Sequence, residues 1–258
     1  MGGAERIGSV SGGSERWRLE REPIPEAGSE DPPRIDVQLL FDLDGTLTDS
    51  SPGIMRCLVH TMRALGQEAP SIPRLRRCVG PPLATVFQSL LTNCDTDDIE
   101  RAIGIYRERY EATGISESAL FPGVVEALAT LHKSTHCLQL VTVKPEPYAR
   151  RILEQFRIAT FFDDVFAPML DDRVTTKSVL VRTALAGGTH QQSDIAMIGD
   201  RAEDIIAARE HRIFAAAAAW GYATSEEIAA AKPDRIFHTM TEYVRWIESR
   251  DGADRSND

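Results

Sequence analysis

Residues 37–50 read VQLLFDLDGTLTDS, and this stretch decides how the rest of the chain is interpreted. Its first five residues are mainly apolar, which is typical of a strand buried on both faces of a sheet. Asp42 and Asp44 follow and share one face of extended backbone, because side chains alternate along a strand. Buried carboxylates repel each other, and a divalent cation relieves that repulsion. Gly45 then permits a sharp turn in which the backbone amides are free to face an anion, so the stretch predicts a site for a metal and an anion. The alternative is a strand that ends in an ordinary Asp-Gly turn.

The composition is that of an ordinary globular protein. Of the 258 residues, 42% are hydrophobic and 26% are charged. The net charge of -10 argues against a nucleic-acid surface, which needs clustered Lys and Arg. No apolar run approaches the ~20 residues that cross a bilayer, so we expect no membrane association. The four cysteines lack metal-type spacing and follow no secretory signal, which predicts reduced thiols and a cytoplasmic location.

The pattern of apolar residues divides the chain into an extension, a core, an insertion and a tail. Residues 1–34 are rich in Gly, Ser, Glu, Arg and Pro and predict a disordered N-terminal extension. Residues 51–117 show four stretches of helical periodicity with no strand between them, which indicates an inserted helical module. Residues 35–50 and 118–249 form the expected core, and residues 250–258 are expected to be a flexible tail.

Strand and helix patterns alternate after the insertion. Five further strands are expected, at residues 138–142, 164–167, 195–198, 213–218 and 235–237. Such alternation is typical of a parallel sheet with helices on both faces, where ligands bind beyond the carboxyl ends of the strands. Asp42, Thr142 and Asp200 each lie at such an end, so we expect them to meet at one edge of the sheet.

Four motifs resemble those of the haloacid dehalogenase-like hydrolase superfamily. Residues 42–49, DLDGTLTD, resemble its first motif, and Thr142 resembles the second. Lys177 resembles the third motif, and residues 199–204, GDRAED, resemble the fourth. The order and spacing of these motifs fit the superfamily from residue 37 to about residue 248.

The resemblance implies a fold and a branch of the superfamily. The expected fold is α/β, with a Rossmann-like parallel sheet core, helices on both faces and an inserted alpha-helical cap domain. The cap would be residues 51–117, since many members insert helices between the first two motifs. Residues 80–83, GPPL, followed by Phe87, resemble the phosphoglycolate phosphatase-like and 5'-nucleotidase-like branch.

The resemblance also implies a role for each aspartate. Asp42 is the expected nucleophile, which attacks phosphorus to give an aspartyl-phosphate and needs no deprotonation at neutral pH. Asp44 is expected to protonate the leaving oxygen and later to take a proton from water. The expected cofactor is Mg²⁺, held by the carboxylates of Asp42 and Asp200 and by the backbone carbonyl of Asp44. Asp204 lies four residues after Asp200 and is either a ligand or an outer-shell partner.

Two further residues complete the expected catalytic set. Thr142 would offer its hydroxyl to a phosphoryl oxygen, although a threonine at a strand end is also simply a good strand former. Lys177 would place a cation beside Asp42 and the transferring phosphoryl group, against the alternative of a solvated surface lysine. Lys144 is the rival candidate for that cation.

The sequence therefore predicts Mg²⁺-dependent hydrolysis of a small phosphorylated metabolite, similar to a phosphoglycolate phosphatase. A 5'-nucleotidase acting on nucleoside monophosphates and a sugar-phosphate mutase are alternatives, and a regulatory module without catalysis is the least favoured. Asp44 argues against dehalogenation, which requires no general acid at that position. Residues 51–120 contain no lysine, which argues against a phosphonate hydrolase that would use a cap lysine. Nothing in the sequence indicates the oligomeric state.

One edge of the insertion is the candidate for substrate selection. Arg77, Gly80 and Pro81 are the predicted substrate residues, because the prolines restrict the backbone and the glycine permits close approach. Arg76 or Arg77 would meet the carboxylate of phosphoglycolate as a bidentate pair. The alternative is that the prolines only separate two helices and that both arginines are solvated.

Overall fold

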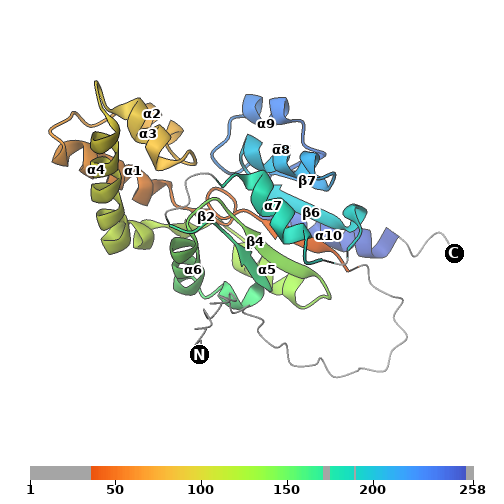
Figure 1. Cartoon of the computed structure of the whole chain (residues 1–258). Helices are drawn as coiled ribbons and strands as arrows, with labels where there is room; N and C mark the ends of the chain where they lie inside the picture. The colour runs from red at the N-terminus through yellow and green to blue at the C-terminus, as the bar shows by residue number, and fades with distance from the viewer. Residues whose placement is uncertain (1–35, 171–174, 189, 254–258) are drawn as a thin grey trace, which may run out of the picture.

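The computed structural model describes residues 36–170, 175–188 and 190–253 (Figure 1). The predicted disordered extension, residues 1–34, lies outside these ranges. So does the end of the predicted tail, residues 254–258, whereas helix α10 (Met240–Ala253) continues three residues beyond Arg250. No helix among the described residues is both long and apolar enough to cross a membrane.

The core is one six-stranded parallel sheet, as the alternating pattern predicts. In spatial order its strands are β5 (Asp164–Phe166), β4 (Cys137–Val141), β1 (Gln38–Phe41), β6 (Ile195–Gly199), β7 (Phe214–Ala218) and β8 (Arg235–Phe237). The central strand β1 is the one that opens the motif, and its four residues are all buried. No strand end differs from the predicted one by more than one residue, which is within the usual uncertainty of strand ends.

Helices cover both faces of the sheet. One face packs against α5 (Val124–His132), α6 (Glu146–Gln155) and α10, and the other against α7 (Lys177–Leu185), α8 (Ala202–Glu210) and α9 (Ser225–Ala231). Along β1, Leu39 and Phe41 belong to the first cluster and Leu40 to the second, which is the alternation of a strand buried on both faces. In β7 the alanines alternate in the same way, and their small side chains let the helices pack closely.

The segment between β1 and α5 contains the inserted helices, which gather on one side of the sheet (Figure 1). They are α1 (Ser51–Ala64), α2 (Ile72–Arg77), α3 (Leu83–Leu90) and α4 (Thr96–Arg109). Asp95 and Asp98 form a capping box at the start of α4, which satisfies two amides of its first turn. After α4 the chain continues as a π-helical turn at Tyr110–Gly114 and a 3₁₀ turn at Ile115–Glu117.

Two short strands that sequence analysis missed lie where the chain enters and leaves the inserted helices. β2 (Thr48–Asp49) pairs antiparallel with β3 (Ala119–Leu120). Each strand has only two residues, too few to show an alternating pattern. The pairing brings both connections of the insertion side by side at the carboxyl edge of the main sheet.

Candidate functional site

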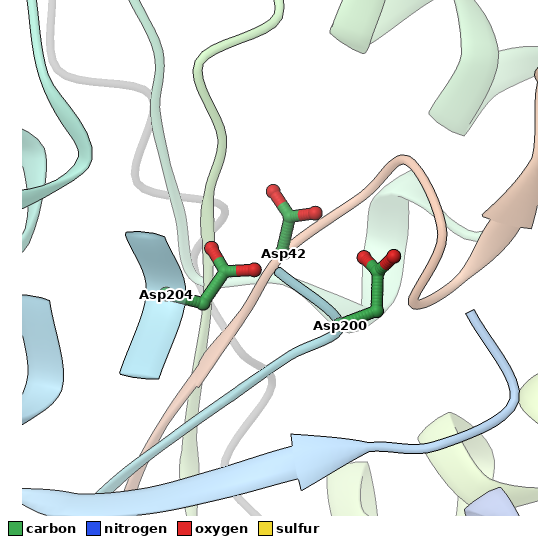
Figure 2. Close-up of side chains that lie close together, drawn as sticks. All are labelled: Asp42, Asp200 and Asp204. Atoms are coloured by element: carbon green, nitrogen blue, oxygen red, sulfur yellow. The ribbon is translucent and has the colours of Figure 1, made fainter. Parts of the chain in front are cut away.

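Three buried aspartates meet at the carboxyl edge of the sheet (Figure 2). Asp42 directly follows β1, and Asp200 directly follows the neighbouring strand β6. Asp204 lies in the first turn of α8, which begins two residues after Asp200. One carboxylate oxygen from each lies within 4.8 Å of the other two. The fold therefore assembles an acidic cluster from segments about 160 positions apart in the chain.

Lys177 is the cation of this cluster. Its Nζ lies 2.5 Å from Asp42 Oδ1 and 2.8 Å from Asp204 Oδ1, and it also donates to the carbonyl of Val141 at 3.0 Å. Burial lowers the pKa of Lys177, but the carboxylates of Asp204 and Asp42 raise it by more, so the ammonium stays charged. The first residue of α7 thus delivers a fixed positive charge beside the predicted nucleophile.

Burial and repulsion between carboxylates raise the pKa values of Asp42 and Asp200 above those of exposed carboxyls. Burial raises the pKa of Asp42 to about 7, because Lys177 only partly offsets the desolvation and Asp204 adds to it. Burial also raises the pKa of Asp200 well above its usual range, and the charges of Asp42 and Asp204 raise it further. The cluster as it stands is therefore short of positive charge, which is the condition that a bound cation corrects.

The donor set fits a hard divalent cation such as Mg²⁺, which takes oxygen ligands. Asp204 is already engaged, since one oxygen faces Lys177 and the other accepts the amide of Arg201 at 3.0 Å. This favours Asp204 as an outer-shell partner and leaves Asp42 and Asp200 as the candidate carboxylate ligands. The carboxylate of Asp44 is not in the cluster, which is compatible with its expected contact through the backbone carbonyl.

Several groups that sequence analysis missed hold Asp200 in place. Thr46 Oγ1 donates to Asp200 Oδ1 at 3.3 Å, and the amide of Tyr222 donates to Oδ2 at 2.7 Å. Gly45, with a φ of 93°, and Gly221 both pack directly against the side chain of Asp200. A Cβ added to either glycine would lie 2.2 Å from an Asp200 atom. Residues 220–222, WGY, follow shortly after β7 and therefore lie at the same edge of the sheet. Their position after a predicted strand was a signal from which sequence analysis could have identified them.

Lys144, the alternative to Lys177 in the sequence analysis, also lies in the site but pairs with a different aspartate. Its Nζ lies 2.7 Å from Asp44 Oδ2, and its amide donates to Thr142 Oγ1 at 3.2 Å. The ammonium also lies 5.0 Å from the ring centre of Tyr110, which comes from the inserted helices. Asp44 Oδ1 is buried without a hydrogen-bond partner among the described groups. The structure therefore brings both lysines and Thr142 to the predicted site.

The predicted substrate residues lie at the end of α2 and on the link between α2 and α3. Arg77 ends α2 and is exposed, as is Arg76. Gly80 has a φ of 111°, and a Cβ added there would lie 3.8 Å from Nε of Arg201, the residue after Asp200. This link therefore reaches the rim of the aspartate cluster, while the substrate contacts assigned to Arg77, Gly80 and Pro81 stay a prediction.

Known proteins share both the sequence and this architecture. Residues 39–218 match the family described as haloacid dehalogenase-like hydrolase. A 5'-nucleotidase of Pseudomonas aeruginosa is 33% identical over 82% of this chain and 95% of its own, and a phosphoglycolate phosphatase of Vibrio parahaemolyticus is 31% identical over 82% and 96%. A solved haloacid dehalogenase-like family hydrolase from Streptococcus pneumoniae superimposes with a TM-score of 0.75 at 31% identity, covering 82% of this chain and 98% of that one.

The match spans most of the described core and includes the strand ends that carry Asp42, Thr142 and Asp200, together with Lys177 and Asp204. The motif order, the parallel sheet and the family match all agree. The chain therefore belongs to the haloacid dehalogenase-like hydrolase family.

Proposed function

We propose that this enzyme is a cytoplasmic, Mg²⁺-dependent phosphatase that hydrolyses a small phosphate monoester through an aspartyl-phosphate on Asp42. The observation that carries the proposal is the pairing of Asp42 with buried Lys177 beside a second carboxylate, Asp200. A phosphorylated small molecule presents the anion that such a site would take, and the phosphatase and nucleotidase relatives act on this class of compound by name.

In the first half-reaction the carboxylate of Asp42 attacks phosphorus. A bond forms between its oxygen and phosphorus, the bond from phosphorus to the leaving oxygen breaks, and Asp44 gives that oxygen a proton. The free Oδ1 of Asp44 is the oxygen available for this transfer, because Oδ2 is paired with Lys144. Lys177 stays charged and stabilises the negative charge on the transferring group.

In the second half-reaction a water molecule attacks the phosphorus of the aspartyl-phosphate. Asp44 takes the proton from that water, the bond between phosphorus and the Asp42 oxygen breaks, and inorganic phosphate leaves. Thr142 would hold a phosphoryl oxygen through its hydroxyl in both steps. When bound by Asp42, Asp200 and the Asp44 carbonyl, Mg²⁺ supplies positive charge that lets two anions approach each other.

Phosphoglycolate is the proposed substrate type, because the exposed arginines at the end of α2, Arg76 and Arg77, could pair with its carboxylate. A 5'-nucleotidase activity is the second candidate, and the 33% identity to the Pseudomonas aeruginosa 5'-nucleotidase favours it. A sugar-phosphate mutase would use the same two aspartates, but it must exclude water from the intermediate.

A panel of phosphate monoesters tests the proposal. Phosphate release is measured with Mg²⁺ for phosphoglycolate, several nucleoside monophosphates and several sugar phosphates, with the Asp42→Asn variant as the blank. We expect release from at least one of the first two groups and none from the blank. Isomerisation of a sugar phosphate without phosphate release would indicate a mutase, and no reaction with any compound would refute the proposal.

A further inference from the structure

Tyr222 contacts both the aspartate cluster and the beginning of the inserted helices. Its backbone amide donates to Asp200 Oδ2 at 2.7 Å. Its phenol oxygen accepts the amide of Ser50 at 2.8 Å and that of Ser51 at 3.2 Å. Its hydroxyl proton can be donated to Asp49 Oδ1, which lies 3.1 Å away. One residue of the link between β7 and α9 thus connects Asp200 with the point where the chain leaves the sheet.

This phenol oxygen replaces a missing cap on α1. The first amides of a helix have no partner within the helix, and a side chain at the N-cap usually satisfies one of them. Ser50 is the N-cap of α1, but its side chain makes no such bond. Tyr222 instead accepts the amides of Ser50 and Ser51, the N-cap and the first helical residue, and Asp49 Oδ1 lies 3.1 Å from the Ser51 amide. The N-terminus of α1 is therefore anchored on a residue of the core.

The neighbouring residues of the same link reach Asp200 from another side. Trp220 Nε1 donates to the carbonyl of Thr46 at 2.9 Å, and Thr46 Oγ1 donates to Asp200. Gly221 leaves no room between the link and Asp200, since an added Cβ would lie 2.2 Å from the Asp200 Cβ. A shift of Asp200 therefore shifts this link, and the link carries the phenol that holds α1.

The position of α1 matters because the insertion has only two covalent connections to the core. These connections pair with each other in β2 and β3, and Asp49 is both the last residue of β2 and a partner of Tyr222. A rotation of the inserted helices relative to the sheet must bend the chain close to residues 49–51. That is where the Tyr222 hydroxyl lies.

We propose that Tyr222 is a positioning residue that couples Asp200 to the orientation of α1, and through α1 to the placement of the inserted helices over the site. The proposal rests on the proposed function for the role of Asp200 as a Mg²⁺ ligand. Because coupling is reciprocal, Mg²⁺ bound at Asp200 should steady the first turn of α1, and a loosened first turn should weaken the binding of substrate.

Hydrogen exchange of the peptide that covers residues 50–56, with and without Mg²⁺, tests the coupling in the full chain. In the wild-type protein we expect slower exchange with Mg²⁺. In Tyr222→Phe, which keeps the backbone bond to Asp200, we expect faster exchange without metal and no response to Mg²⁺. The Kd for Mg²⁺, measured by calorimetry, should rise by no more than about twofold: reciprocity requires a small loss of affinity, but the amide that holds Asp200 is kept.

Tyr148→Phe is the matched control. Tyr148 lies on α6 and donates to Glu111 of the inserted helices at 2.6 Å, so it is another bond between the core and the insertion, without a bond to Asp200. Its variant should leave the Mg²⁺ response of residues 50–56 intact. In kinetics, Tyr222→Phe should raise KM about fivefold with kcat changed less than twofold. Equal effects of the two variants on residues 50–56, or a Tyr222→Phe protein that still responds to Mg²⁺, would overturn the proposal.

The result can be separated from a failure of the proposed function. Asp200→Asn without any metal should also change the exchange of residues 50–56, and this change should vanish when Tyr222→Phe is added. If the wild-type protein binds no Mg²⁺ but this metal-free pattern appears, the coupling stands and only the metal role is wrong. If Asp200→Asn leaves residues 50–56 unchanged, the coupling is wrong.

Discussion

The carboxyl edge of the sheet and the link between α2 and α3 face the same site but are built differently. At the sheet edge Asp42, Lys177 and Asp204 are buried, and both carboxylates pair with the ammonium of Lys177. Where α2 leads into that link, Arg76 and Arg77 are exposed. The difference teaches that charges for the chemistry are preorganised by burial, whereas the groups proposed to choose a substrate stay solvated until a substrate arrives.

The largest effect is expected from a substitution in the buried cluster at the sheet edge. Asp42→Asn replaces the nucleophile with an amide of the same shape, so turnover should fall at least about 10³-fold while the fold is kept. Steady-state phosphate release and circular dichroism measure the two properties. Activity above a few per cent of wild type would mean that Asp42 does not attack phosphorus.

The second prediction ranks the two buried lysines. Lys177→Ala removes the cation beside Asp42 and should lower kcat about 10²-fold or more, while Lys144→Ala removes the partner of Asp44 and should have the smaller effect. Parallel measurement of kcat for the two variants checks this ranking. The reverse order would assign the phosphoryl-stabilising charge to Lys144.

The third prediction compares a glycine at the sheet edge with one in the inserted helices. Gly221→Ala forces Asp200 to move, so the Kd for Mg²⁺ should rise about 10- to 100-fold. Gly104→Ala in α4 is the control, because an added Cβ there meets nothing within 4 Å. It should leave Mg²⁺ binding unchanged and stabilise the fold by about 0.5–1 kcal/mol. Calorimetry and thermal unfolding measure both effects, and equal Mg²⁺ affinities for the two variants would show that Asp200 is not a ligand.

The fourth prediction concerns the exposed side. If the link between α2 and α3 selects the substrate, replacing Arg77 and Pro82 should change the ratio of kcat/KM among phosphate monoesters by about tenfold, or about 1.4 kcal/mol. Phosphoglycolate and a nucleoside monophosphate are the pair to compare. A uniform loss for all substrates would show that the link helps the site to close but does not discriminate.

The smallest expected effect concerns the pH dependence of stability. Burial raises the pKa of Asp42 from 3.8 to about 7, so the folded protein binds this proton more tightly than the unfolded chain does. Without metal, the stability contributed by this group therefore falls as pH rises between those two values and stays low above pH 7. Mg²⁺ competes with the proton, so the Tm increase that Mg²⁺ causes should be larger at pH 8 than at pH 6. An equal increase at both values would place the metal away from Asp42.

The sequence alone was sufficient for the parallel sheet, its helices and the family. The alternation of apolar strands and amphipathic helices is a local property, and the motif residues directly follow three of those strands, so their meeting at one edge follows from the geometry of a parallel sheet. The inserted helices were also predicted, although the π-helical turn at Tyr110–Gly114 was not. A single extra residue in a helical turn leaves no trace in the 3.6-residue period.

Only the tertiary structure decided which charge faces which. Both lysines were visible in the sequence, but their assignment to Asp42 and Asp44 depends on how α7 and the end of β4 approach β1. The contacts of Tyr222 with Ser50 and Ser51 were equally hidden, because they join segments more than 170 positions apart. Periodicity and spacing report where a side chain lies along its own element, whereas ion pairs and hydrogen bonds between elements depend on atomic positions after packing.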